Sequence, residues 1–180
     1  MSRGKLRVGV LVSGSGSNLQ ALIDACAAPD HPAEIVTVIS NRPDVRALDR
    51  AKAAGIPAVV FDHKNYPDRA SFDADMQKAL DEAGVEFICL AGFMRLLTTA
   101  FVEHWRGRMI NIHPSLLPSF KGLNVQQRAI DAGARFAGCT VHFVTPEMDV
   151  GPIIQQAVVP IHQDDTGDTL AARILLQAHR

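Results

Sequence analysis

Strand-like and helix-like segments alternate along the chain, and this alternation limits its fold more than any other feature. Short apolar runs bounded by glycine or polar residues indicate strands, whereas apolar residues spaced three or four apart indicate helices. The predicted strands cover residues 6–12, 34–40, 57–61, 87–92, 109–113, 139–144 and 153–160. The predicted helices cover residues 18–28, 45–55, 68–84, 99–105, 126–133 and 169–180. Repeated strand–helix–strand units favour an α/β sandwich whose sheet starts parallel, and the short loop between the last two strands predicts an antiparallel C-terminal portion.

Composition narrows the class of protein further. The chain has 180 residues, of which 47% are hydrophobic, and a net charge of -1, which fits one ordinary domain. It has no basic stripe that would neutralise the phosphates of a nucleic acid, and no apolar stretch approaches the ~20 residues that a membrane span needs. The basic start of the chain leads into a short apolar run without a cleavage site, so that run is predicted to be a strand rather than a signal peptide.

The cysteines argue against both a disulfide framework and a zinc site. Cys26, Cys89 and Cys139 are an odd number and lie far apart within apolar segments. We therefore expect a reducing, cytoplasmic setting. No HExxH or comparable motif predicts a metal.

Ligands of open α/β sheets bind beyond the carboxyl ends of the strands, and three loops at such ends are unusual here. The first, SGSGSN at residues 13–18, has the glycines and the following helix that suit an anion. It lacks the Gly-Lys-Ser/Thr of a P-loop, and Leu19 stands where a dinucleotide fingerprint has its third glycine, so a single phosphate is favoured. The alternative is a tight turn before a helix that Ser17 or Asn18 caps.

The second loop is AGFMRLL at residues 91–97, which is apolar apart from Arg95. Such a loop can cover a flat aromatic ligand and offer it backbone hydrogen bonds. The alternative is ordinary core under a loop.

The third loop follows MINIH at residues 109–113. Residues two apart on a strand point to the same side, so Asn111 and His113 should point together. An Asn amide can donate to a developing oxyanion, and His is suited to proton transfer near neutral pH. The alternative is a structural histidine, because a lone His on a strand is usually structural.

An imidazole with such a role needs a carboxylate partner, and the loop TPEMDVGP at residues 145–152 offers two. Glu147 and Asp149 are both candidates, and the residues themselves do not choose between them. No side chain has the surroundings of an activated nucleophile. These groups therefore favour direct transfer, in which one substrate supplies an attacking amine or water.

Four motifs, in this order and spacing, resemble the phosphoribosylglycinamide formyltransferase family, the folate-dependent transformylases of purine synthesis. They are SGSGSNLQAL, AGFMRLL, INIHPSLLPSFKGL and VHFVTPEMDVGPII, and the resemblance runs from about residue 6 to the C-terminus. It implies a Rossmann-like three-layer α/β sandwich with the formyltransferase fold, in a single domain over residues 1–180. It also implies transfer of a formyl group from 10-formyltetrahydrofolate, a co-substrate, to glycinamide ribonucleotide, without a metal.

The resemblance also implies the site residues. Asn111 would stabilise the oxyanion, His113 would be the general acid, and Asp149 would orient and charge the His. Three residues would hold the phosphate of the nucleotide: Gly16, Ser17 and Asn18. The residues matching the folate site are Arg69, Met94, Arg95, Leu96, Leu97, Asn111, Thr145, Pro146, Glu147, Met148 and Asp149.

The chain also departs from the family pattern. Asn124, Val125 and Gln126 replace the usual His-x-His, and Ala178 replaces an acid that often precedes the position of His179. The last helix contributes to the nucleotide site in the family that this chain resembles, so the resemblance also makes Leu175 and Ala178 candidates for that site. Because relatives extend some residues beyond the position of Arg180, we expect either a truncated C-terminus or a natural short form.

Three other functions are possible for such a site. Two are enzymes that use a different acceptor of the formyl group, and the third is a binding protein without catalytic activity. A formyltetrahydrofolate deformylase would use water, but that family adds an N-terminal regulatory domain. Methionyl-tRNA formyltransferase shares the SLLP loop but adds a C-terminal domain for tRNA. A non-catalytic binder of phosphorylated metabolites would not need Asn111, His113 and Asp149. We therefore expect small-molecule substrates and neither nucleic acid nor membrane as partners, and the sequence leaves monomer and homodimer open.

Overall fold

The computed structural model describes residues 4–180, and its residues form two compact units. The first unit ends at Met109, and the second is Ile110–Arg180. Residues 1–3, part of the basic start of the chain, lie outside the described residues.

The first unit contains a parallel four-stranded sheet. Its strands are β1 (Leu6–Val12), β2 (Ala33–Ser40), β3 (Ala58–Val60) and β4 (Phe87–Leu90). Strand β1 pairs with both β2 and β4, and β2 pairs with β3. Val10, Leu11 and Val12 are fully buried, as expected for a central strand of a parallel sheet that is covered on both faces.

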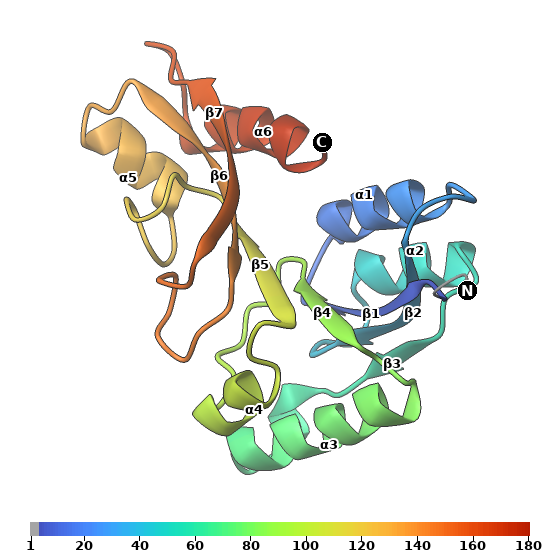
Figure 1. Ribbon diagram of the computed structural model, residues 1–180. Coiled ribbons are helices and arrows are strands. Elements are labelled where there is room, and N and C mark those ends of the chain that lie inside the picture. Colours follow the sequence, from blue (N-terminus) through green and yellow to red (C-terminus); the bar gives the residue numbers. More distant parts are fainter. Residues whose placement is uncertain (1–3) are drawn as a thin grey trace. The chain divides into compact units, whose positions relative to one another are not determined.

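Helices cover both faces of this sheet (Figure 1). Helices α1 (Ser17–Cys26) and α2 (Arg46–Ala53) lie on one face, and α3 (Arg69–Glu82) and α4 (Thr99–His104) lie on the other. The Asp68 side chain caps α3 by accepting the N–H of Ser71 at 2.8 Å. This unit therefore has the three layers that the sequence predicts.

The second unit contains an antiparallel sheet. Strand β5 (Met109–His113) pairs with β6 (Phe136–Phe143), which pairs with β7 (Ile153–Pro160). Helices α5 (Val125–Asp131) and α6 (Gly167–Ala178) complete the unit. One hydrophobic core cluster of this unit consists of Ala137, Cys139, Val159, Leu170 and Ile174. The predicted α/β class with an antiparallel C-terminal portion is confirmed, and this portion also includes the pairing of β5 with β6.

The predicted strands and helices all exist, but several bounds differ. Strand β6 begins at Phe136 rather than Cys139, because residues 136–138 also pair with β7. Helix α6 begins at Gly167, two residues earlier than predicted, because the side chain of Thr166 accepts the N–H of Thr169 in a capping box. The 3₁₀ helix η1 (His63–Asn65) was not predicted.

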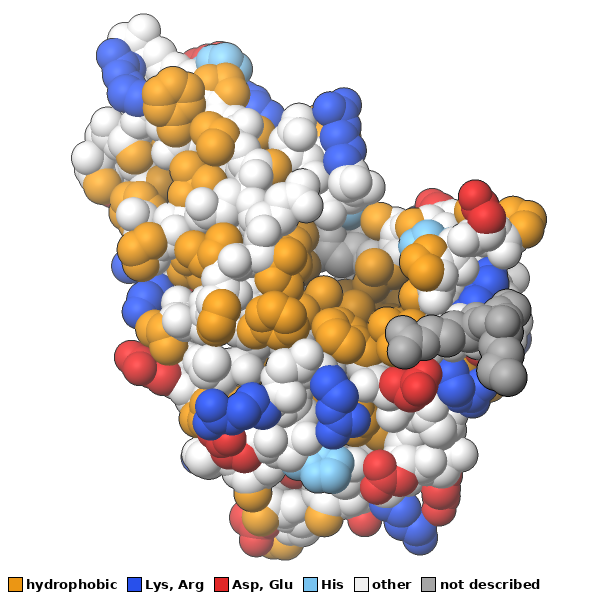
Figure 2. All heavy atoms as spheres, viewed as in Figure 1, with side chains coloured by type: hydrophobic (Ala, Val, Ile, Leu, Met, Phe, Trp, Pro, Cys, Tyr) orange, Lys and Arg blue, Asp and Glu red, His pale blue; other side chains and the backbone are white. Residues whose placement is uncertain are grey.

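The surface of the second unit carries many apolar side chains. Figure 2 shows hydrophobic side chains gathered over the face that carries β6 and β7. Phe136, Ile153, Ile154 and Val158 are each about half exposed or more. Apolar residues along these strands therefore do not all mark core. Among the described helices, none has both the length and the apolar character to cross a membrane.

Candidate active site

Strand pairing in the second unit brings Asn111 and His142 together. The antiparallel register places these residues directly opposite each other on β5 and β6. The side-chain amide nitrogen Nδ2 of Asn111 lies 3.3 Å from Nε2 of His142. His113, two residues along β5, is also buried. Asn111 lies at His142, and both His142 and His113 lie close to Asp149. This agrees with the prediction that Asn111 and His113 point to the same side of the strand.

Asp149 is the carboxylate that lies against these histidines. Its Oδ2 atom is 3.5 Å from Nδ1 of His113, and its Oδ1 atom is 3.9 Å from Nε2 of His142. Oδ2 also accepts the backbone N–H of Gly122 at 2.9 Å. Asp149 is 9% exposed, whereas Glu147 in the same loop is exposed. The geometry therefore selects Asp149 from the two carboxylates that the residues alone left open.

The backbone of the loop between β6 and β7 explains how Asp149 is held. Asp149 adopts φ 55°, in the left-handed region that Asp tolerates better than most residues. Gly151 follows closely, and an added Cβ there would overlap the carbonyl oxygen of Phe143. This sharp turn directs the Asp149 carboxylate back toward the histidines.

His113 has an oxygen acceptor at each ring nitrogen. Its Nε2 atom lies 3.1 Å from the carbonyl oxygen of Phe120, while Nδ1 faces Asp149. Only a doubly protonated imidazole can donate to both at once. This arrangement suits a group that holds a proton and delivers it during a reaction.

The loop after β5 is fixed by Thr140 of β6. The hydroxyl of Thr140 donates to the carbonyl of Ser115 at 2.7 Å and accepts the N–H of Leu117 at 3.1 Å. The side-chain amide of Gln156 donates to the same hydroxyl and to the carbonyl of Leu117. The Leu117–Pro118 peptide bond is cis. The buried Thr140 thus anchors the loop that supplies Phe120.

His142 is the site residue that sequence reasoning missed. It is 2% exposed, and burial lowers its pKa below the ordinary value, against the opposing effects of the Phe143 carbonyl and the Asp149 carboxylate. The nearby His113 adds to the lowering. Pairing residues 109–113 with 139–144 would have revealed it, because that register sets His142 opposite Asn111.

In the first unit, the predicted loop at residues 13–18 is shorter than expected. It ends at Gly16, which is the N-cap of α1, and Ser17 is already helical. Gly16 has φ 70°, and an added Cβ would lie 2.7 Å from Ala47, so only glycine fits. The alternative in which Ser17 or Asn18 caps α1 does not hold, because both residues already lie in its first turn and no side chain caps it. Instead, Oδ1 of Asn18 is buried without a partner. The free N–H groups of this first turn are what an anion would use.

Ser13 links this loop to residues 91–97. Its hydroxyl accepts the backbone N–H of Met94 at 2.8 Å and donates to Oδ1 of Asn41 at 2.5 Å. Both loops of the first unit are therefore held by one buried hydroxyl.

The loop at residues 91–97 exposes its apolar side chains. Met94 is 67% exposed and Leu96 is 55% exposed, so the alternative of ordinary core does not hold for these two. The guanidinium of Arg95 stacks 4.6 Å from the centre of the Phe72 ring, and its buried Nε has no partner. Arg69, the first residue of α3, is exposed.

The residues that depart from the family pattern lie around α5 and α6. Asn124 is the N-cap of α5 and has φ 54°, while Gln126 lies in the first turn of that helix. Ala178 packs against the core of the second unit, and Leu175 is partly buried.

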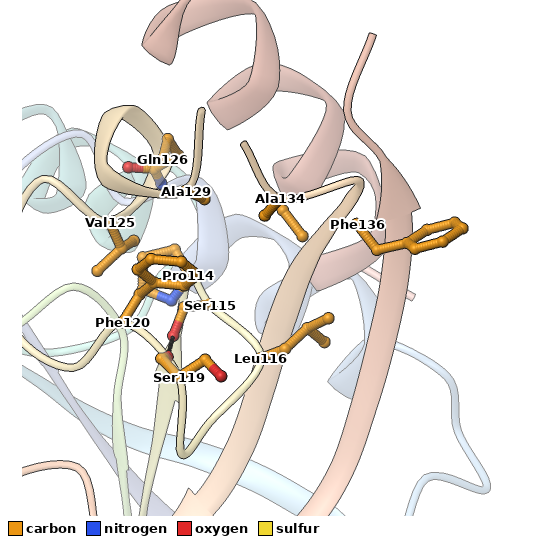
Figure 3. Close-up of a pocket in the computed structure, with 11 residues that line it drawn as sticks. Pro114, Ser115, Leu116, Ser119, Phe120, Val125, Gln126, Ala129, Ala134 and Phe136 are labelled. Atoms are coloured by element: carbon orange, nitrogen blue, oxygen red, sulfur yellow. Dashed lines mark hydrogen bonds between the residues drawn. The ribbon is translucent and has the colours of Figure 1, made fainter. Parts of the chain in front are cut away.

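A pocket of about 170 Å³ in the second unit is separate from the histidine cluster (Figure 3). It lies between the loop after β5, helix α5 and the start of β6. Its lining includes Ser115, whose hydroxyl already donates to the carbonyl of Ser119 at 2.7 Å. None of Asn111, His113, His142 and Asp149 lines it. Neither a histidine nor a carboxylate lines this pocket, so it lacks the groups proposed here for chemistry. Within residues 4–180, no group of three or more His, Cys, Asp or Glu side chains is arranged to hold a metal ion.

Comparison with known proteins identifies the class. The chain belongs to the formyl transferase family, which matches residues 6–180. Among its relatives is the phosphoribosylglycinamide formyltransferase of Haemophilus influenzae, 46% identical over 174 residues, which cover 97% of this chain and 82% of that protein. The solved structure of glycinamide ribonucleotide transformylase 1 from Symbiobacterium toebii has a TM-score of 0.95 and 48% identity, covering 98% of this chain and 83% of that one.

A longer relative contains a region like this chain. The trifunctional purine biosynthetic protein adenosine-3 of Bos taurus is 52% identical over 176 residues, which cover 98% of this chain. The chain spans only 17% of the length of that relative. The resemblance predicted from the motifs and the formyltransferase fold are confirmed by these comparisons.

Proposed function

We propose that this chain transfers the formyl group of 10-formyltetrahydrofolate to the amine of glycinamide ribonucleotide, a step of de novo purine synthesis. The observation that carries the proposal is the cluster that the partly buried Asn111 forms with the buried His113 and Asp149. It combines an amide donor, an imidazole and a carboxylate within one unit. The names of the relatives support the choice of substrates.

The chemistry follows from these three groups. The amine attacks the formyl carbon and forms a tetrahedral intermediate, whose oxyanion accepts an N–H of Asn111. The bond between that carbon and N10 of the folate then breaks, and His113 gives its proton to N10. The attacking nitrogen loses a proton in turn. Asp149 keeps the protonated ring oriented at 3.5 Å.

The protein itself supplies no nucleophile in this scheme. Burial raises the pKa of Cys89 to about 12 and raises the pKa of Cys139 as well. Both thiols therefore stay protonated at neutral pH. A direct attack by the substrate amine fits these surroundings better than a covalent enzyme intermediate.

Further residues complete the proposal. Gly16, Ser17 and Asn18 would hold the phosphate of the nucleotide at the first turn of α1. Arg69, residues 94–97, Asn111 and residues 145–149 would contact the folate, for which the exposed Met94 and Leu96 offer apolar surface. We also propose that residues 1–180 act as one domain, and the three free cysteines support a cytoplasmic setting.

An absorbance assay of 10-formyltetrahydrofolate conversion tests the proposal. Turnover that requires glycinamide ribonucleotide is the expected result. Equal turnover without the nucleotide would identify a deformylase instead. No turnover in either case would contradict both enzymatic functions.

A further inference from the structure

The contacts of His142 fix which of its nitrogens carries the proton. Its Nδ1 atom lies 3.0 Å from the carbonyl oxygen of Phe143, which can only accept a hydrogen bond. In the neutral ring Nδ1 therefore carries the hydrogen, and Nε2 has a free lone pair. The group of Asn111 that faces Nε2 at 3.3 Å must then be a donor, as the amide nitrogen Nδ2 is.

This contact fixes the orientation of the Asn111 amide. One of its two N–H bonds is directed at His142, so the plane of the amide and the direction of the second N–H are set. An amide without this acceptor can rotate by half a turn and present its oxygen in place of the N–H. An oxygen there would repel an oxyanion rather than stabilise it.

We propose that His142 is a positioning residue: its neutral imidazole accepts one N–H of Asn111 and so aims the other at the developing oxyanion. The inference rests on the function proposed for Asn111. His142 contacts neither the formyl group nor a substrate in this scheme and acts only through the amide.

The surroundings of His142 make this contact sensitive to pH. The groups that face its ring are Asn111 and His113 on β5 and Asp149 in the loop after β6, while its register partner on β7 is the apolar Ile153. Protonated Nε2 would place an N–H against the N–H of Asn111 and would turn toward Oδ1 of Asp149 instead. Burial, which lowers the pKa of His142, keeps the ring neutral at neutral pH.

A double-mutant cycle with Asn111 tests the proposal. His142→Ala should lower kcat roughly 10- to 100-fold, while the KM values should stay within about twofold. This loss should not exceed the ~10²- to 10³-fold loss that follows when an oxyanion donor itself is removed. Added to Asn111→Ala, it should cause no further loss. His142→Gln should recover much of the rate, because its amide oxygen can accept the same N–H. The exposed His162→Gln is the matched control and should match the wild type. Losses that multiply in the double variant would overturn the proposal.

A measurement without substrate separates this proposal from the proposed function. In protein with ¹⁵N-labelled histidine, NMR should show His142 as the neutral tautomer protonated at Nδ1 at neutral pH. The Nε2-protonated tautomer, or a charged ring at neutral pH, would refute the positioning role even in an active enzyme. If the wild type converts neither substrate, the proposed function fails, and the spectrum still decides the tautomer. The spectrum also decides if His142→Ala does not fold.

Discussion

Replacing Asp149 with Asn tests how much the buried carboxylate contributes to the reaction. The Asn side chain keeps an oxygen that can accept the N–H of Gly122, so the loop should stay in place while the charge is lost. Two unit charges 3.5 Å apart interact by roughly 5 kcal/mol at an effective dielectric constant of about 20. Because each ~1.4 kcal/mol changes a rate tenfold, this sets an upper limit of about three and a half orders of magnitude.

We expect Asp149→Asn to lower kcat by roughly 10²- to 10³-fold, which is below this upper limit. His113 has transferred its proton only in part in the transition state, so only part of the charge–charge interaction affects the rate. The KM values should change little, because the lost interaction lies between two protein groups. The absorbance assay gives both constants, and circular dichroism checks the fold. Asp164→Asn, an exposed carboxylate in the same unit, is the control and should behave as the wild type. A kcat within tenfold of the wild type would refute the orienting and charging role of Asp149.

Three other variants test separate parts of the structure. His113→Ala should lower kcat by about 10²- to 10⁴-fold without loss of fold, and a smaller loss in the same assay would exclude it as the general acid. Gly151→Ala should lower both Tm and kcat because its Cβ would overlap the Phe143 carbonyl and shift the loop of Asp149; thermal melts that match the wild type would contradict this. The paired Arg173 holds the pKa of Asp165 well below its usual value of 3.8, so the stability from this ion pair is present above that value and is lost as pH falls below it. Asp165→Asn should therefore lower Tm at pH 7 and flatten the acid dependence of Tm, and parallel curves of Tm against pH would argue against it.

Local sequence patterns predicted most of the secondary structure. Apolar runs and helical spacing depend on neighbours in the chain, so the strand at residues 109–113 and the one at 153–160 were predicted with their observed bounds. At the start of α1 the prediction was wrong because a contact from another element decided. Gly16 is the N-cap of α1, and Ala47 of α2 leaves no room for a Cβ at that position. The residues of SGSGSN do not show that Ala47 lies close to Gly16.

The sequence by itself determined the fold class, the candidate loops and the family, because periodicity, glycine placement and motif order are properties of the chain. It also placed Asn111 and His113 on one side of a strand, since the period of a strand is fixed by its backbone. The residues alone left Glu147 and Asp149 open and the resemblance implied Asp149, while the tertiary structure shows that Asp149 lies at His113. Only the tertiary structure showed that His142 faces Asn111. These contacts join residues about 30 to 40 positions apart, and they depend on the β5–β6 register and on the left-handed turn at Asp149. The β5–β6 register and the turn at Asp149 depend on packing across the whole unit. Local sequence patterns contain no information about that packing.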